Sequence, residues 1–224
     1  MSIDSLGFGD STVVVSESVR SIGGNLDCGL TMDKQISSLC RSAWCYLHQI
    51  GKIRKYLTLE QTKTVVHAHV TSRLDQNNSL LIGLPKEKLR RLQRVQNAAA
   101  RLIAQVKKRD HITPILIQLH WLPIDQRVLV LYKVLLIVFK CRIGQGPEYL
   151  DELLAPYVPL RELRIGSENI LCVPEGHYVN TKKRAFGIRG PAEWNNLPRH
   201  LRMKESIYSF KSSLKTYLFK LAYE

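Results

Sequence analysis

Residues 86–109 read KEKLRRLQRVQNAAARLIAQVKKR and combine a helical pattern with a strong positive charge. Apolar residues recur at three- and four-residue steps, which is the spacing of one face of an α-helix. They are Leu92, Val95, Ala99, Leu102, Ile103 and Val106. Nine Lys and Arg residues stand against Glu87 alone, which gives a local charge of +8. The stretch predicts a helix that packs one face on a core and presents the other face to phosphates.

Cations of this stretch and of a second basic cluster are the candidate phosphate-binding side chains. A helical wheel predicts that four of them gather roughly opposite the apolar stripe: Arg90, Arg94, Arg101 and Lys108. The full candidate set is Arg90, Arg91, Arg94, Arg101, Lys107, Lys108 and Arg109, with Lys182, Lys183 and Arg184 from the second cluster. We expect point charges and bidentate donors to a sugar–phosphate backbone, without base readout. The alternative is a solvated face that keeps a basic protein soluble.

The second basic cluster is interleaved with aromatic residues. Its cations are Lys182, Lys183, Arg184, Arg189, Arg199, Arg202 and Lys204. The aromatic residues are Tyr178, Phe186 and Trp194. Such side chains either stack on bases or belong to the hydrophobic core, and the sequence leaves both interpretations open.

The chain as a whole is strongly basic. Its 224 residues include 33 Lys and Arg against 19 Asp and Glu, a formal net charge of +14. Residues 1–32 carry four acids against Arg20 alone, a net charge of −3, which leaves +17 on the remainder. This balance favours a polyanionic partner, either nucleic acid or an acidic membrane surface, over a neutral small molecule. Hydrophobic residues make up 45% of the chain, which is ordinary for a globular protein.

Periodicity and turn signals predict a mainly α protein. Strand-like runs at 11–15 and 19–22 predict a β-hairpin that ends at Gly23-Gly24. Helices are predicted from Asp33, Thr58 (with a capping box to Gln61), Pro85, Thr113-Pro114 (to about Trp121) and Pro123 (to about Gly144), with a final amphipathic helix over 207–221. The helix after Pro123 is apolar nearly all round, which is typical of a helix in the middle of a bundle.

Pro and Gly residues punctuate the chain after Pro147, and strands are predicted at 170–173 and around Tyr178. We therefore expect three units. They are an N-terminal β-hairpin in 1–32, a helical bundle in 33–144, and an irregular α+β segment in 145–224.

No catalytic or metal-binding pattern stands out in the sequence. The acidic residues are scattered singly, without the paired aspartates that hold two divalent cations. The gaps between Cys28, Cys40 and Cys45 fit no common zinc spacing, and His67 with His69 lacks a nearby third ligand. There is no G-x-S-x-G string and no phosphate-cradling glycine loop. We expect no enzyme activity, no metal and no cofactor.

Cysteine usage and hydropathy bear on the compartment. Five cysteines form an odd set without a C-x-x-C pair, which favours a reducing nuclear or cytoplasmic setting. No signal peptide is readable at the N-terminus. The longest apolar run, 128–139, is shorter than the roughly 20 residues that a bilayer requires, so we expect no membrane association.

Short strings along the chain resemble those of a known family in both identity and order. They are SRLD (72–75), NSLL (78–81), GLP (83–85), LQRVQNAAARLI (92–103), RDHITP (109–114), LHWLP (119–123) with Arg127, PEYL (147–150), AF (185–186), WNNLP (194–198) and SFKSSLKTYLF (209–219). The chain resembles the C-terminal part of the reverse transcriptase of non-LTR retrotransposons, the long interspersed elements of the jockey and chicken-repeat type. The resemblance covers about 26–224, and 18–23 is similar to the family's last palm strands.

The resemblance implies a thumb with the C-terminal segment behind it. In the family this part grips template RNA and primer duplex while the palm joins nucleotides. The aromatic-Ala-Asp-Asp motif that carries the family's catalytic aspartates does not occur in this sequence. The expected function is a non-catalytic fragment that binds RNA or RNA–DNA duplex weakly and non-specifically. The alternative is a protein-interaction module or a relic of a truncated element, which self-associates through apolar surface that would face the missing palm.

Overall fold

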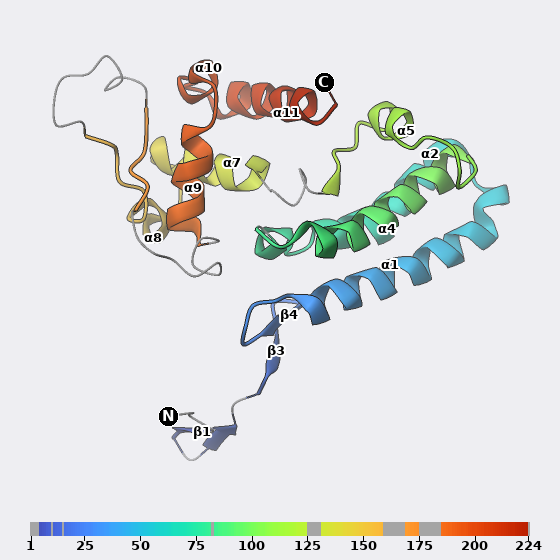
Figure 1. The fold of residues 1–224 in the computed structure, drawn as a ribbon, viewed down its shortest axis with the longest axis horizontal. Helices are drawn as coiled ribbons and strands as arrows, with labels where there is room; N and C mark the ends of the chain where they lie inside the picture. Colours follow the sequence, from blue (N-terminus) through green and yellow to red (C-terminus); the bar gives the residue numbers. More distant parts are fainter. Residues whose placement is uncertain are drawn as a thin grey trace.

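The computed structural model describes residues 5–9, 11–14, 16–81, 83–124, 131–158, 169–174 and 185–223. These residues form a mainly helical chain that begins with short antiparallel strands, as the sequence predicts (Figure 1). The N-terminal elements are β1 (Ser5–Phe8), β2 (Ser11–Val14), β3 (Ser18–Ser21) and β4 (Gly24–Asp27). The helices that follow are α1 (Asp33–Ile53), η1 (Arg54–Tyr56), α2 (Leu59–Val66), η2 (His67–Thr71), α3 (Ser72–Asp75), η3 (Asn78–Leu81), α4 (Lys86–Ala104), α5 (Thr113–Gln118), α7 (Leu131–Arg142), α8 (Glu148–Asp151), α9 (Phe186–Asn195), α10 (Arg199–Arg202) and α11 (Ile207–Tyr223).

The strand pairing differs from the predicted hairpin. We expected 11–15 to pair with 19–22, but β2 pairs with β1, and β3 pairs with β4. The reason is the turn at Ile22-Gly23, where both residues have positive φ, 48° and 74°. Two successive residues of this kind form the tight turn that matches the twist of two antiparallel strands. Gly24 therefore starts a strand instead of ending the hairpin.

Helices α1 and α4 lie side by side and run in the same direction (Figure 1). At their starts, Lys88 Nζ lies 2.9 Å from Asp33 Oδ2. Further along, Arg91 Nη2 donates to Ser37 Oγ over 3.2 Å. Because α1 and α4 run in the same direction, the chain must return from the end of α1 to the start of α4. The segment α2–η2–α3 makes this return. The predicted capping box at its start is confirmed: Gln61 N donates to Thr58 Oγ1, and Thr58 N donates to Gln61 Oε1.

The apolar stripes predicted for these helices form the first buried cluster. Its members from α1, from α2–α3 and from α4 are Ile36, Leu39, Cys40, Ala43, Leu47, Ile50, Val66, Val70, Leu74, Leu89, Leu92, Val95, Ala99 and Ile103. The stripe of α4 ends earlier than predicted. The helix stops at Ala104, and Val106 lies beyond it in a small third cluster with α5 and Tyr223.

Helix α7 packs with the C-terminal elements instead of lying in the middle of the N-terminal bundle. Its buried residues share the second cluster with α9 and α11, where the rings of Phe139 and Phe210 stack at 4.2 Å beside Trp194. An apolar pattern gives the amount of surface that a helix must bury but not the partner that buries it. The predicted unit boundary at 144 therefore does not separate the two clusters.

Two further predictions for the C-terminal half are corrected. A helix, α9, spans Gly187, Gly190 and Pro191, where the sequence suggested only breaks. These glycines allow close packing: a Cβ added at Gly190 would lie 3.2 Å from Val138 Cγ2 of α7. The predicted strand at 170–173 is only an isolated bridge between Pro156 and Leu171, and Tyr178 lies outside the described residues.

Candidate nucleic-acid interface

Helix α4 places three of the predicted arginines on one face. Arg90, Arg94 and Arg101 are separated by four and seven residues, so they lie within about 40° of one another around the axis. Arg94 and Arg101 are about 10.5 Å apart along that axis at 1.5 Å per residue. The opposite face of α4 is buried in the first cluster, which fixes the rotation of the helix. The arginine face is therefore held toward the outside by the packing of the apolar stripe.

Part of this face forms one wall of a groove of about 790 Å³, which we call the α1–α4 groove. Its lining residues come from α1 and the turn after it, from α4, and from the loop after α4. They are Trp44, Gly51, Arg54, Arg94, Asn97, Ala98, Arg101, Leu102, Gln105, Val106 and Lys108. Four of these residues carry a positive charge, and no Asp or Glu is found among the described residues of the lining. The groove is therefore a concentrated cationic site between two helices.

Arg54 serves the structure of the groove. Its Nε donates to Leu102 O and its Nη2 to Ile103 O, each over 3.1 Å. Its Nη1 donates to Leu57 O over 2.8 Å. The guanidinium thus satisfies carbonyl groups of the last turn of α4 that have no partner within the helix, where a cation is also favoured by the helix dipole. Arg54 joins the ends of the two helices that form the walls.

Arg94 and Arg101 are the side chains best placed to bind an anion in the groove. Arg94 is exposed, and its guanidinium makes no hydrogen bond or ion pair within the described part of the chain. Arg101 is half-buried; its Nη2 donates to Asp110 O over 3.3 Å, and its Nε is buried without a hydrogen-bond partner. An unpaired buried donor carries a free-energy cost, and because this Nε is buried it is not itself exposed to an anion in the groove.

The other candidates on and after α4 do not converge on the same point. Arg90 pairs with Glu87 one turn away, and Arg91 points to Ser37 of α1. Lys108 is not on the helical wheel as predicted, because Gln105 takes a left-handed conformation (φ 54°) and ends α4. Lys108 nevertheless lines the groove from the loop after the helix.

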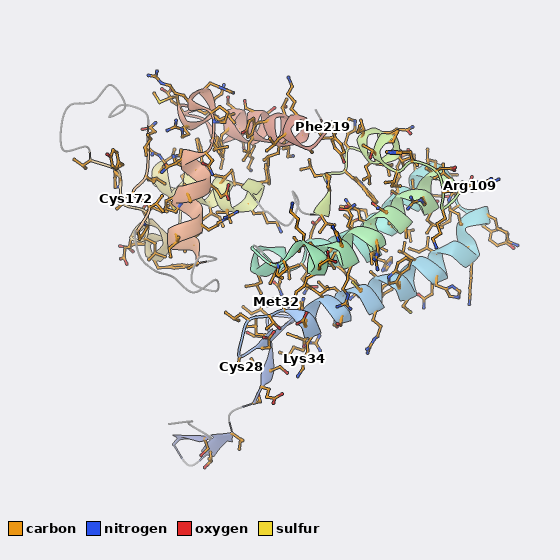
Figure 2. All side chains as sticks on the ribbon, viewed as in Figure 1. Cys28, Met32, Lys34, Arg109, Cys172 and Phe219 are labelled. Atoms are coloured by element: carbon orange, nitrogen blue, oxygen red, sulfur yellow. The ribbon has the colours of Figure 1, made fainter. Side chains whose placement is uncertain are left out.

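The remaining loop cations extend the basic surface beyond the groove. Asp110 Oδ2 accepts a hydrogen bond from Lys107 N over 2.7 Å, which closes the turn that presents exposed Lys107 and Arg109. Figure 2 shows Arg109 beyond the end of α4, whereas Lys34 lies near the start of α1. The basic surface thus extends from the groove to the loop that follows α4.

The second basic cluster offers less to a ligand. Lys182, Lys183 and Arg184 lie outside the described residues. Arg202 is buried and donates its Nε to Leu197 O over 3.0 Å. Of the aromatic residues, Trp194 is fully buried and donates its Nε1 to Asn169 O, so the core interpretation is confirmed for it.

Sequence reasoning missed Trp44 as a site residue. Trp44 lies on α1 between the buried positions Ala43 and Leu47, yet 47% of its surface is exposed. The sequence did contain one signal for it: Trp44 lies next to the apolar stripe of α1 and not on it. A large aromatic residue at such a position is not needed to fill the core. The groove as a whole was not visible because its walls come from α1 and α4, which are about 50 residues apart in sequence.

Other chemistry is limited in the described part of the molecule. Burial raises the pKa of the Cys40 and Cys141 thiols, which disfavours their reactive thiolate form. No group of three or more His, Cys, Asp or Glu side chains that could hold a metal ion occurs among the described residues. No helix in the same ranges is both long and apolar enough to cross a bilayer.

Comparison of the chain with protein-family models, curated proteins and solved structures finds no match. The similarity to non-LTR reverse transcriptases therefore depends on the short strings in the sequence. The α1–α4 groove provides a separate physical basis for a function.

Proposed function

We propose that this protein binds the backbone of RNA or of an RNA–DNA duplex through the α1–α4 groove and the basic loop after α4. The observation that carries the proposal is the lining of the groove. Among the described residues, the lining has four cationic side chains and no carboxylate, and the guanidinium of one of them, Arg94, makes no hydrogen bond or ion pair. In this proposal the chain is the thumb and post-thumb part of a non-LTR reverse transcriptase, and it binds without joining nucleotides.

The arrangement suits phosphates better than a single carboxylate. Arg94 and Arg101 lie on one face about two helical turns apart, so they can contact different phosphates of one strand. Arginine donates two parallel hydrogen bonds to a phosphate and keeps its charge at any physiological pH. All three nitrogens of the Arg54 guanidinium already donate to backbone carbonyls, so we expect Arg54 to contribute its positive charge and not to act as the main phosphate donor. We therefore expect affinity to come from charge and geometry, with little preference for base sequence.

The test is binding of a dye-labelled RNA–DNA hybrid followed by fluorescence anisotropy at constant salt. The double variant R94A/R101A is expected to bind at least about tenfold more weakly, because each lost charge-assisted hydrogen bond is worth on the order of 1 kcal/mol or more. The matched control K211A/K215A removes the same charge from α11, away from the groove lining. Equal losses in both double variants would show that net charge, and not the groove, drives binding.

A second candidate function is self-association, which the exposed apolar residues of the N-terminal strands favour. Val14, Val19 and Ile22 are 73%, 56% and 90% exposed. They lie on or beside two-stranded sheets whose outer edges are unpaired within the described residues, and such edges accept a further strand from a second copy. Sedimentation velocity over a concentration series tests this candidate. A monomer at every concentration contradicts it.

A further inference from the structure

The α1–α4 groove has an aromatic and apolar part that binding to phosphates alone does not explain. Trp44 is about half exposed, and Gly51, Ala98 and Leu102 line the groove with it. The cations Arg94, Arg101 and Lys108 line the same groove. A ligand that fits this lining has a flat apolar portion beside an anionic one.

We infer that the groove binds an unpaired nucleotide, with its base stacked on Trp44 and the neighbouring phosphates bound by Arg94 and Arg101. The inference rests on the proposed function and specifies the ligand class of the groove as single-stranded nucleic acid. Unpaired nucleotides at the end of a duplex belong to the same class.

The position of Trp44 supports a ligand contact. The buried face of α1 passes through Ala43 and Leu47, and the first cluster does not include Trp44 among its buried or partly buried members. Its indole makes no hydrogen bond to any described residue, so the Nε1 donor is available. Trp44 lines the groove together with other apolar or small residues, so its exposed ring is part of a continuous apolar surface instead of a single exposed side chain. A stacked base would cover that area.

The small residues of the groove leave room for a ring. Gly51 has no side chain, and a Cβ built there would only touch Leu102 Cδ1 at 3.9 Å, so this part of the groove is open. Ala98 lines the groove from α4. The volume of about 790 Å³ lies within the roughly 300–1,000 Å³ that is typical of small-ligand sites. A nucleotide therefore fits between the two helices.

An unpaired strand is favoured over a duplex interior because of the stacking geometry. Bases inside a duplex stack on one another and do not offer a face to a protein ring. Bases of a single strand do, and their stacking on aromatic side chains is worth about 1–3 kcal/mol per base with little sequence preference.

The experiment compares two single-stranded oligonucleotides of equal length and charge, one with bases and one abasic throughout. Anisotropy is measured for the wild-type chain, W44A and W44F at one salt concentration. We expect wild type to bind the base-containing strand about five- to 150-fold more tightly than the abasic strand, which is the range that one stacked base provides. W44A should lose this preference while it keeps its affinity for the abasic strand. W44F should keep part of the preference.

A second readout is the fluorescence of Trp44 itself. Stacking should quench the emission of wild type when the base-containing strand is added, and the abasic strand should not. W44F retains Trp121 and the fully buried Trp194, so its emission should change little. Thermal unfolding of both variants followed by circular dichroism checks that they are folded.

The outcomes separate this inference from the proposed function. If wild type binds both strands equally, or if W44A weakens both strands to the same extent, the inference is wrong. Loss of binding in R94A/R101A would still support the proposed function in that case. If wild type binds neither strand nor the hybrid duplex, both are wrong.

Discussion

Replacing Arg54 with alanine removes the side chain that joins the end of α1 to the end of α4. Three donors are lost, those to Leu57 O, Leu102 O and Ile103 O. Hydrogen bonds from a charged donor each contribute roughly 1.5–3 kcal/mol, but Arg54 is only part-buried and water can reach some of these carbonyls. We therefore expect the free energy of unfolding to fall by about 2–4 kcal/mol in total.

Urea unfolding followed by circular dichroism measures this change from the shift in midpoint at unchanged slope. R54K is the matched variant, since it keeps the charge near the helix end but cannot donate to three carbonyls in a plane, and it should recover less than half of the loss. R41A, on the exposed side of α1, is the control and should stay within about 0.5 kcal/mol of wild type. A stability of R54A equal to that of R41A would refute the role assigned to Arg54.

Two further predictions concern Asp27 and the cysteines. Burial opposes ionisation of Asp27, but hydrogen bonds from the Thr31 and Met32 amides outweigh it and lower its pKa. Its contribution to stability is therefore present near neutral pH, begins to fall below about pH 4 and is lost as pH passes through the lowered pKa. The difference between D27N and wild type in urea unfolding should shrink steadily as pH is lowered from about 7 through 4, and a constant difference would contradict this. With a thiol reagent under native conditions, the three exposed cysteines should react at once and buried Cys40 and Cys141 only on unfolding; five equal rates would contradict the burial.

The helices around the first cluster could be predicted because their signals are local. The stripe from Ile36 to Ile50 shows the period of a helix, and the Thr58–Gln61 capping box marks a helix start within four residues. Such patterns depend on neighbours along the chain and not on distant partners.

The errors lie where a distant partner or a turn decides the outcome. The strand partners depended on the conformation of Ile22-Gly23, and α7 packs with α9 because Gly190 allows a close approach to Val138. From the sequence alone, glycine and proline residues within α9 indicate a break in the helix. Only the helix that packs against them explains why α9 continues.

The candidate site was predictable in part for the same reason. The arginine face of α4 follows from helical spacing alone, and the structure places Arg94 and Arg101 of that face in the lining of the groove. The contributions of Trp44 and Arg54 depend on how α1 lies against α4, which no local pattern gives. Lys108 also lines the groove, but the predicted helical spacing does not place it there, because α4 ends before it.

The most direct test of the α1–α4 groove as the nucleic-acid interface is the salt dependence of binding. The slope of log K against log salt for a hybrid duplex should be shallower in R94A/R101A than in wild type by about 1.8, since each phosphate contact contributes about 0.9 on B-form DNA. K211A/K215A, which lies on α11, should keep the wild-type slope. If R94A/R101A keeps the wild-type slope, or if both double variants change it equally, nucleic acid does not bind at this groove.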